Sequence, residues 1–241
     1  CLTSRHDLED DALGFSLGAV DYIAKPVVPP LLLARVHNQL TLKVAADFLR
    51  DKSSYLEEEV ARRTQEVHDV QDVTILTLAS LAEARDNDTG NHILRTQRYV
   101  RLLATALRDH PACASQLDEQ TIEWLYKSAP LHDIGKVGIP DAILLKPGKL
   151  TPDEFEVMKT HTTLGRDALA MAEQRLGKTV PFLRIAKEIA YSHQEKWDGS
   201  GYPQGLVGEA IPLSARLMAV ADVYDALISQ RVYKPPYDHA E

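Results

Sequence analysis

The stretch LHDIGKVGIP, residues Leu131–Pro140, places a histidine, an aspartate and a lysine within about one helical turn. His132 and Asp133 are adjacent and Lys136 follows one turn later, so that the three side chains are expected on one helix face. An imidazole and a carboxylate are common ligands of divalent metals, and a carboxylate has two oxygens with which to bridge two metals. The stretch therefore indicates hydrolytic metal chemistry. The alternative is a helix end with a buried histidine and a solvated aspartate.

The composition indicates a folded, acidic protein. The 241 residues are 44% hydrophobic and 26% charged, which is enough for a packed core. A formal net charge of -8 argues against binding to nucleic-acid polymers or anionic membranes. Cys1 and Cys113 are too few for a disulfide framework and fit a reducing compartment. With no apolar run of membrane-spanning length and no signal peptide, we expect a cytoplasmic protein.

Residues 1–30 have the pattern of the end of a domain. The segment 2–4 predicts the end of a strand, 7–19 an amphipathic helix, and 19–26 a short strand closed by Lys25 and Pro26. These pieces cannot bury a core of their own.

From Pro29 to about Asp86 the chain has no glycine, and no proline after Pro30, which predicts one nearly continuous helix. A loose heptad stripe follows its middle, formed by Leu49, Leu56, Val60, Val67 and Val70. The stripe predicts a signalling helix that pairs in a homodimer. Polar residues interrupt it, so that a single solvated linker helix is the alternative.

From Val73 onward we expect helices separated by turns and no alternating strand. Further metal-type side chains lie in this part, at Asp88, His92, His161, His193 and Asp222. Asp222 lies in a segment that is apolar nearly all round, where an unpaired carboxylate would cost several kcal/mol. Taken singly, each histidine is better explained as a core or surface residue. Together with the adjacent His-Asp pair they have the ligand types of a two-metal hydrolase.

Six motifs together resemble those of the HD-GYP phosphodiesterases, a branch of the HD hydrolases that cleaves cyclic di-GMP. They are RDNDTGNH at 85–92, HDIGK at 132–136, the single His161, EKWDGSGYP at 195–203, DVYDAL at 222–227 and RVYK at 231–234. The resemblance covers residues 73–239 and rests on the order and spacing of the motifs. It implies a mainly α fold, an all-helical HD-type domain over 73–241 that follows the long helix over 31–72.

The resemblance also implies a role for each matched residue. The first metal would be held by His92, His132, Asp133 and Asp222, and the second by Asp133, His161 and His193. A hydroxide between two divalent transition metals would be the nucleophile, with iron, manganese or nickel expected and zinc also suitable. Lys136 would support the leaving oxygen or the phosphoryl group. The other substrate contacts would be Gly201, Tyr202, Arg231 and Lys234.

The loop that contains Gly201, Tyr202 and Pro203 is expected to owe its shape to the glycine, which permits a bend, and to the proline, which fixes it. Trp197 would either stack on a base or anchor this loop as a buried residue.

The sequence departs from the family pattern at two positions. Gln194 follows His193 where many members have a second histidine, and Asp88 stands where members with a third metal have glutamate. Both are therefore candidates for weak or third-metal ligands, and we expect two metals per chain. The chain also stops at Glu241, short of the helices that usually complete the domain.

Residues 1–30 resemble the last third of a response-regulator receiver domain. By that match Thr3 and Lys25 are switch residues and the bond before Pro26 is cis, while the strand with the phospho-accepting aspartate is missing from the sequence. An unrelated N-terminal hairpin is the alternative.

The function implied is a response-regulator output enzyme that hydrolyses cyclic di-GMP to pGpG or GMP and receives its signal from a sensor histidine kinase. One alternative is a catalytically weak cyclic di-GMP receptor that signals through partners such as diguanylate cyclases. Another is an HD-type hydrolase of nucleotide mono- or triphosphates, against which the GYP and RVYK elements count.

Overall fold

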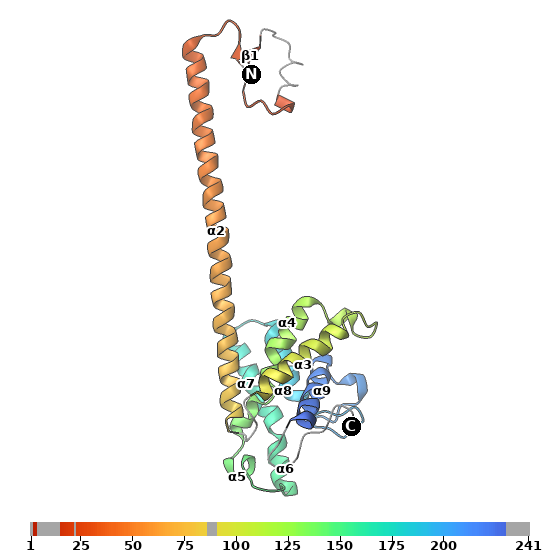
Figure 1. The fold of residues 1–241 in the computed structure, drawn as a ribbon. Helices are drawn as coiled ribbons and strands as arrows, with labels where there is room; N and C mark the ends of the chain where they lie inside the picture. Colours follow the sequence, from red (N-terminus) through yellow and green to blue (C-terminus); the bar gives the residue numbers. More distant parts are fainter. Residues whose placement is uncertain (1, 4–14, 22, 86–90, 230–241) are drawn as a thin grey trace. The chain divides into compact units, whose positions relative to one another are not determined.

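The computed structural model describes residues 2–3, 15–21, 23–85 and 91–229 (Figure 1). The chain divides into two compact units, Cys1–His68 and Asp69–Glu241. Helix α2, Pro29–Glu83, begins in the first unit and ends in the second. No helix of the described residues is long and apolar enough to cross a membrane.

In the first unit, strand β1 (Leu2–Thr3) pairs in parallel with β2 (Ile23–Ala24). The two predicted strands are therefore confirmed, and the Lys25–Pro26 bond is cis, as the receiver resemblance implied. The helix expected over 7–19 lies mostly outside the described residues. Arg35 of α2 pairs with Asp21 at 2.5 Å, which ties the start of the helix to the segment before β2.

Helix α2 confirms the prediction of one uninterrupted helix, although it ends at Glu83, slightly before the predicted end. Its prolines occupy the first turn, where a missing backbone N–H costs nothing. Ion pairs one turn apart, such as Arg63 with Glu59 at 2.9 Å, support its middle. The predicted heptad stripe is exposed along its whole length, whereas Ile75, Ala79 and Ala82 near the end of α2 are buried. The stripe therefore has no covering partner within the described residues.

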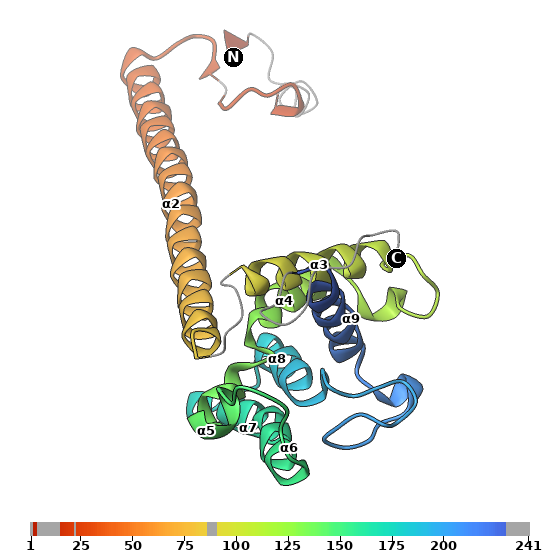
Figure 2. The same cartoon turned by 60° about the horizontal axis from the view of Figure 1, so that its bottom comes forward.

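The second unit is built from helices and short 3-10 turns, and its described residues contain no strand, as predicted (Figure 2). Its α-helices after α2 are α3 (His92–Ala106), α4 (Glu119–Ser128), α5 (Asp141–Leu144), α6 (Pro152–Lys159), α7 (His161–Leu176), α8 (Pro181–Ser192) and α9 (Leu213–Ile228). Its 3-10 turns are η1 (Ala114–Gln116), η2 (Ala129–Leu131), η3 (Ile134–Gly138) and η4 (Gly208–Ala210).

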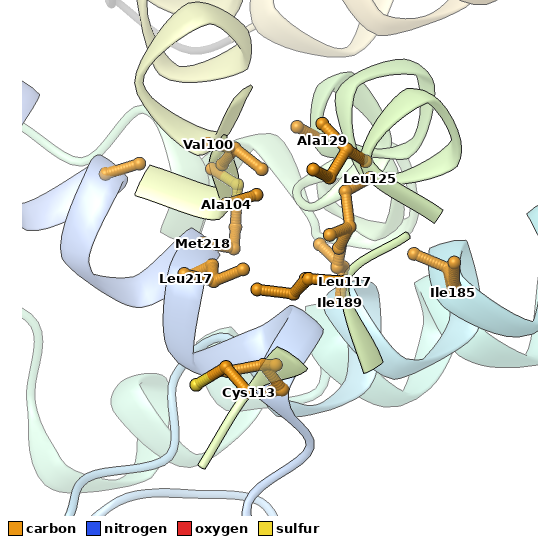
Figure 3. Packing of buried hydrophobic residues seen from close by; sticks show 13 residues of the cluster. Val100, Ala104, Cys113, Leu117, Leu125, Ala129, Ile185, Ile189, Leu217 and Met218 are labelled. Atoms are coloured by element: carbon orange, nitrogen blue, oxygen red, sulfur yellow. The ribbon is translucent and has the colours of Figure 1, made fainter. Parts of the chain in front are cut away.

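The main core lies where α3, α4, α8 and α9 meet (Figure 3). Ile185 and Ile189 recur one turn apart on α8, and both are at most 2% exposed. They meet Val100 of α3, Leu125 of α4 and Met218 of α9 in one cluster. This packing fixes the positions of the ends of α3 and α8, from which metal-type side chains project.

Candidate metal centre

The stretch 131–140 does not form the single α-helical face that its spacing predicted. It forms two 3-10 turns, η2 and η3, with His132 and Asp133 at their junction. In a 3-10 helix the side chains at i and i+3 eclipse, so that Lys136 Nζ lies 2.8 Å from Asp133 Oδ2. The predicted proximity of Asp133 and Lys136 therefore holds, for a different geometric reason.

Gly135 allows this turn to pack directly on the start of α7. A Cβ at this position would lie 1.9 Å from the carbonyl oxygen of His161 and 2.5 Å from the amide nitrogen of Gly165. Both neighbours are backbone atoms and cannot rotate away. The glycine of the HDIGK motif thus brings the turn that carries Asp133 against the helix that begins with His161.

Four buried histidines lie in the site, three of them against Asp133 and the fourth, His92, against Asp222, and each is at most 5% exposed. Their Nδ1 atoms all face acceptors: Ala129 O at 2.9 Å from His132, Met158 O at 2.8 Å from His161, Ile189 O at 3.0 Å from His193, and Asp225 Oδ2 at 2.7 Å from His92. A carbonyl or carboxylate requires a proton on Nδ1 of the neutral imidazole. The lone pair is then on Nε2, the atom left to coordinate a metal.

The Nε2 atoms converge in two groups. The donor atoms of His92, His132 and Asp222 lie within 4.8 Å of one another, and so do those of Asp133, His161 and His193. Asp133 also reaches the first group, because its Oδ2 lies 3.2 Å from His132 Nε2. The structure thus brings together the six residues predicted as metal ligands, with Asp133 between the two groups.

The donor set fits divalent cations. His132 Nε2 and Asp133 Oδ1 are buried and have no hydrogen-bond partner within the described residues. Buried polar atoms without partners are costly, and a cation in each group would satisfy one of them, because His132 Nε2 lies in the first group and Asp133 Oδ1, 3.4 Å from His161 Nε2, lies in the second. Imidazole and carboxylate donors together suit first-row transition metals.

Electrostatics in the site favour a carboxylate at Asp133 and neutral imidazole in the second group. Burial opposes ionisation of Asp133, but Lys136 and His132 outweigh it and hold its pKa well below the ordinary value. Burial lowers the pKa of His161 to about 4 despite the nearby Asp133, so that its imidazole is neutral at pH 7. For His132, burial is outweighed by Asp133 and Asp222, which raise its pKa to about 9. A metal at this position would displace that proton and meet the same negative charges.

Asp225 is a residue of the site that the sequence reasoning missed. The Asp225 side chain is 2% exposed, and its carboxylate accepts a hydrogen bond from His92 Nδ1. It also accepts two hydrogen bonds from Arg95, from Nε to Oδ1 at 2.6 Å and from Nη2 to Oδ2 at 2.9 Å. Arg95 outweighs the effect of burial, with help from His92, and lowers the pKa of Asp225. Asp225 lies three residues after Asp222, so that both face α3 from one side of α9. That spacing was the available signal.

The helix of Asp222 is apolar nearly all round, as predicted, but it is not buried all round. Val220 and Val223 of α9 are 56% and 58% exposed, so that the helix buries only one side. The Asp222 side chain itself is 23% exposed, and the deeply buried carboxylate of α9 is Asp225. Asp222 nevertheless faces His92, with Oδ1 3.5 Å from Nε2.

The loop after His193 closes over the second group. Gly201 lies so close to the backbone of Lys196 that a Cβ at position 201 would be 2.2 Å from Lys196 N. The φ angle of Gly201 is not left-handed, so that the glycine is needed for this close approach and not, as predicted, for a bend. The Tyr202–Pro203 bond is cis, and the Tyr202 ring lies 6.2 Å from the His161 ring. Burial, with the nearby Asp133 charge, raises the pKa of Tyr202 to about 12, which keeps its phenol protonated.

Glu195 is a second residue that was not predicted from the sequence, and its side chain binds the backbone of this loop. The residue is 5% exposed and accepts backbone N–H groups of Gln204 at 2.7 Å and Leu206 at 3.0 Å. Trp197 is 62% exposed, so that the alternative of a buried anchor is wrong for this residue.

The remaining predicted residues are placed as follows. Asp88, Arg231 and Lys234 lie outside the described residues. The backbone carbonyl of Gln194 accepts the N–H of Tyr202 at 3.2 Å, and its side chain remains a predicted weak ligand. Thr3 is the last residue of β1, and Lys25 directly follows β2.

Comparisons with known proteins agree with this architecture. A family model described as "HD domain" matches residues 43–241. A "Probable cyclic di-GMP phosphodiesterase" of Vibrio cholerae is 57% identical over 240 residues, 100% of this chain and 54% of that relative. A "Cyclic di-GMP phosphodiesterase" of the same organism is 64% identical over 72% of this chain and 35% of its own length. The "Cyclic di-GMP phosphodiesterase response regulator RpfG" of Xanthomonas campestris is 41% identical over 90% of this chain and 54% of its own length.

This chain thus spans about half of the first and third relatives and about a third of the second. The family model covers most of the chain, including both groups of metal-type residues and the loop after His193. The chain therefore belongs to the HD domain family.

Proposed function

We propose that this chain is a metal-dependent phosphodiesterase that hydrolyses cyclic di-GMP to pGpG or GMP. The observation that carries the proposal is the convergence of four Nδ1-anchored imidazoles in two adjacent groups with the Asp133 and Asp222 carboxylates. The choice of substrate is supported by the names of the three relatives, which share 41–64% of the aligned residues with this chain.

In this proposal His92, His132, Asp133 and Asp222 would hold one cation, and Asp133, His161 and His193 would hold another. Bound cations would supply a water of lowered pKa and neutralise charge on the phosphate oxygens. The same donor types suit iron, manganese, nickel and zinc, so the metal that supports the reaction has to be identified by loading the protein with each in turn.

The chain's own residues have defined tasks in the reaction. The Nδ1 acceptors fix each imidazole in the tautomer that presents Nε2 to the centre. Lys136 lies 2.8 Å from Asp133 and is placed to attract the phosphoryl group or the leaving oxygen as negative charge develops there. Tyr202, with its phenol protonated, offers a hydrogen-bond donor beside the second group.

The second phosphate and the guanine bases require contacts outside the metal groups. Arg231 and Lys234 are proposed for these contacts on the basis of the motif RVYK alone. Gly201 contributes through the loop shape that its close approach to Lys196 permits.

We also propose that residues 1–30 are the end of a receiver domain and that 31–72 form a signalling helix ahead of the enzyme domain at 73–241. The parallel pair of β1 with β2 supports the first assignment, and the exposed stripe of α2 supports pairing in a homodimer. A sensor histidine kinase would then be the upstream partner. A receptor role with diguanylate cyclases as partners is the alternative if hydrolysis is weak.

The test is product chromatography on cyclic di-GMP with protein loaded separately with Mn²⁺, Fe²⁺, Ni²⁺ or Zn²⁺. We expect pGpG or GMP with at least one metal and no product after chelation. A parallel reaction with 3'3'-cyclic GMP–AMP, which keeps both phosphates and replaces one guanine, measures base selectivity. Tight binding of cyclic di-GMP without turnover under every metal would favour the receptor role and contradict the enzyme.

A further inference from the structure

Arg85 connects the C-terminal end of α2 to the turn that carries Lys136. It lies two residues after the end of α2 at Glu83, and the N–H of Ala84 still bonds to Ser80 O at 2.8 Å, as in a helical turn. The Arg85 guanidinium donates from Nη1 to Val137 O and, at 3.3 Å, to Lys136 O. Its Nη2 donates to Ile139 O at 3.1 Å and to Asp141 Oδ1 at 2.5 Å.

Three of these acceptors are backbone carbonyls at the C-terminal end of η3 or directly after it, and the fourth is the Asp141 carboxylate; of the three, Lys136 O also accepts the N–H of Ile139 at 3.1 Å. A helix end needs donors for its last carbonyls, and a cation there also complements the negative end of the peptide dipoles. A five-residue 3-10 turn has little stability of its own. Val137 is 52% exposed and the Asp141 side chain 71% exposed, whereas Ile139, which follows the turn, is 1% exposed and anchors the chain there. The fork of Arg85 therefore restrains the exposed side of the end of η3, in addition to the buried Ile139 side chain.

The position of Lys136 depends on that turn. Its contact with Asp133 follows from the eclipsed i, i+3 geometry of the 3-10 conformation, which a looser turn would lose. The last turn of α2 also faces the site directly. Ala79, Ala82 and Glu83 line a cavity of about 20 Å³ together with His132 and Lys136, a volume that holds roughly one water.

We propose that Arg85 is a positioning residue that holds Lys136 over the metal centre and joins the HDIGK turn mechanically to the end of α2. The proposal rests on the proposed function for its kinetic consequence, because Lys136 is there assigned to the reacting phosphate. A displacement of the end of α2 would then reach Lys136 through one guanidinium, without altering the metal ligands.

The experiment compares Arg85→Ala, Arg85→Lys, Lys136→Ala and the double variant Arg85→Ala with Lys136→Ala. Arg85→Ala should reduce kcat/KM on the order of 10²-fold, which is typical of misplaced catalytic groups, with metal content unchanged. Arg85→Lys keeps the charge but not the fork and should recover only part of the loss. The double variant should be no slower than Lys136→Ala, because both changes remove one function.

Arg166→Ala is the matched control. Its side chain is 33% exposed, as is that of Arg85, but it pairs with its neighbour Asp167 and stacks on Tyr191. We expect near wild-type kinetics and a multiplicative effect when it is combined with Lys136→Ala.

Hydrogen exchange of the peptide that covers residues 136–141 provides a readout that needs no activity. Arg85→Ala should exchange there on the order of tenfold faster than wild type, as expected for loss of charged hydrogen bonds, and Arg166→Ala should not. Unchanged exchange, or a double variant whose loss is the product of the two single losses, would overturn the proposal. If the wild type fails to hydrolyse cyclic di-GMP, the proposed function fails, and the exchange result alone decides whether Arg85 holds the turn.

Discussion

Replacing Asp225 by asparagine should weaken the first metal group while leaving the second intact. The carboxylate accepts one hydrogen bond from His92, two from Arg95 and a longer one, at 3.4 Å, from the Ser229 hydroxyl. Asparagine keeps one acceptor oxygen and turns an N–H₂ group toward the remaining donors. If that group faces His92, the imidazole must move its proton to Nε2 and can no longer coordinate a metal.

The magnitude follows from the hydrogen bonds that the substitution removes. Loss of a carboxylate partner of a metal-bound histidine typically costs 10–100-fold in metal affinity, or about 1.4–2.7 kcal/mol. Loss of charge-assisted hydrogen bonds to Arg95 should also lower the free energy of unfolding by about 1.5–3 kcal/mol. Metal affinity and stability therefore fall together, and a control is needed to separate them.

Glu173→Gln supplies that control. The Glu173 side chain is 18% exposed, pairs with Lys187 at 2.5 Å, and lies about three turns along α7 from His161. We expect this variant to lose the contribution of a partly exposed ion pair away from the metal groups and to keep wild-type affinity at both groups.

The assay is titration of metal-free protein with Mn²⁺ in competition with a chelator, which resolves two affinities per chain. Asp225→Asn should weaken one of them 10–100-fold and leave the other within about twofold. Unchanged affinities, or an equal loss at both groups, would refute the reasoning that Asp225 acts through His92.

Two further substitutions test other parts of the site. Gly135→Ala should lower the free energy of unfolding by about 1–3 kcal/mol and reduce metal retention, because the added Cβ would collide with the backbone of His161. A Tm and a metal content equal to those of wild type would contradict the packing described. Gln194→His should raise the affinity for the second metal, which is the more easily lost, since an imidazole is a better donor than an amide. Metal content is measured by elemental analysis after dialysis. No change in the variant, or three metals in the wild type, would count against the prediction of two metals per chain.

Patterns of local origin could be predicted from the sequence. Helix α2 follows from a run without glycine or internal proline, and its Pro29 start needs no tertiary information. The metal-type residues were recognisable by kind and order, and the structure brings His92, His161 and His193 together around the HDIGK turn. Their roles as ligands remain predictions until metal is measured.

Features that depend on contacts distant in sequence could not be predicted. Asp225 lies 133 residues from His92, and only the packing of α9 on α3 makes it the partner of that histidine. Hydrophobicity alone overstated the burial around Asp222, because Val220 and Val223 remain exposed on the far side of α9. The 3-10 form of the HDIGK turn depends on Gly135 meeting the backbone of α7, which no local pattern encodes.

The most direct test of the two-metal account is the metal-to-protein ratio of wild type and Asp133→Ala by elemental analysis after dialysis, with hydrolysis of cyclic di-GMP measured on the same samples. Asp133 lies between both groups and its Oδ1 has no hydrogen-bond partner among the described residues, so that its loss should leave both cations under-coordinated. We predict two metals per chain and turnover in the wild type, and fewer than about one metal and no turnover in Asp133→Ala. An Asp133→Ala variant that retains both metals, or that hydrolyses cyclic di-GMP at the wild-type rate, would contradict the account.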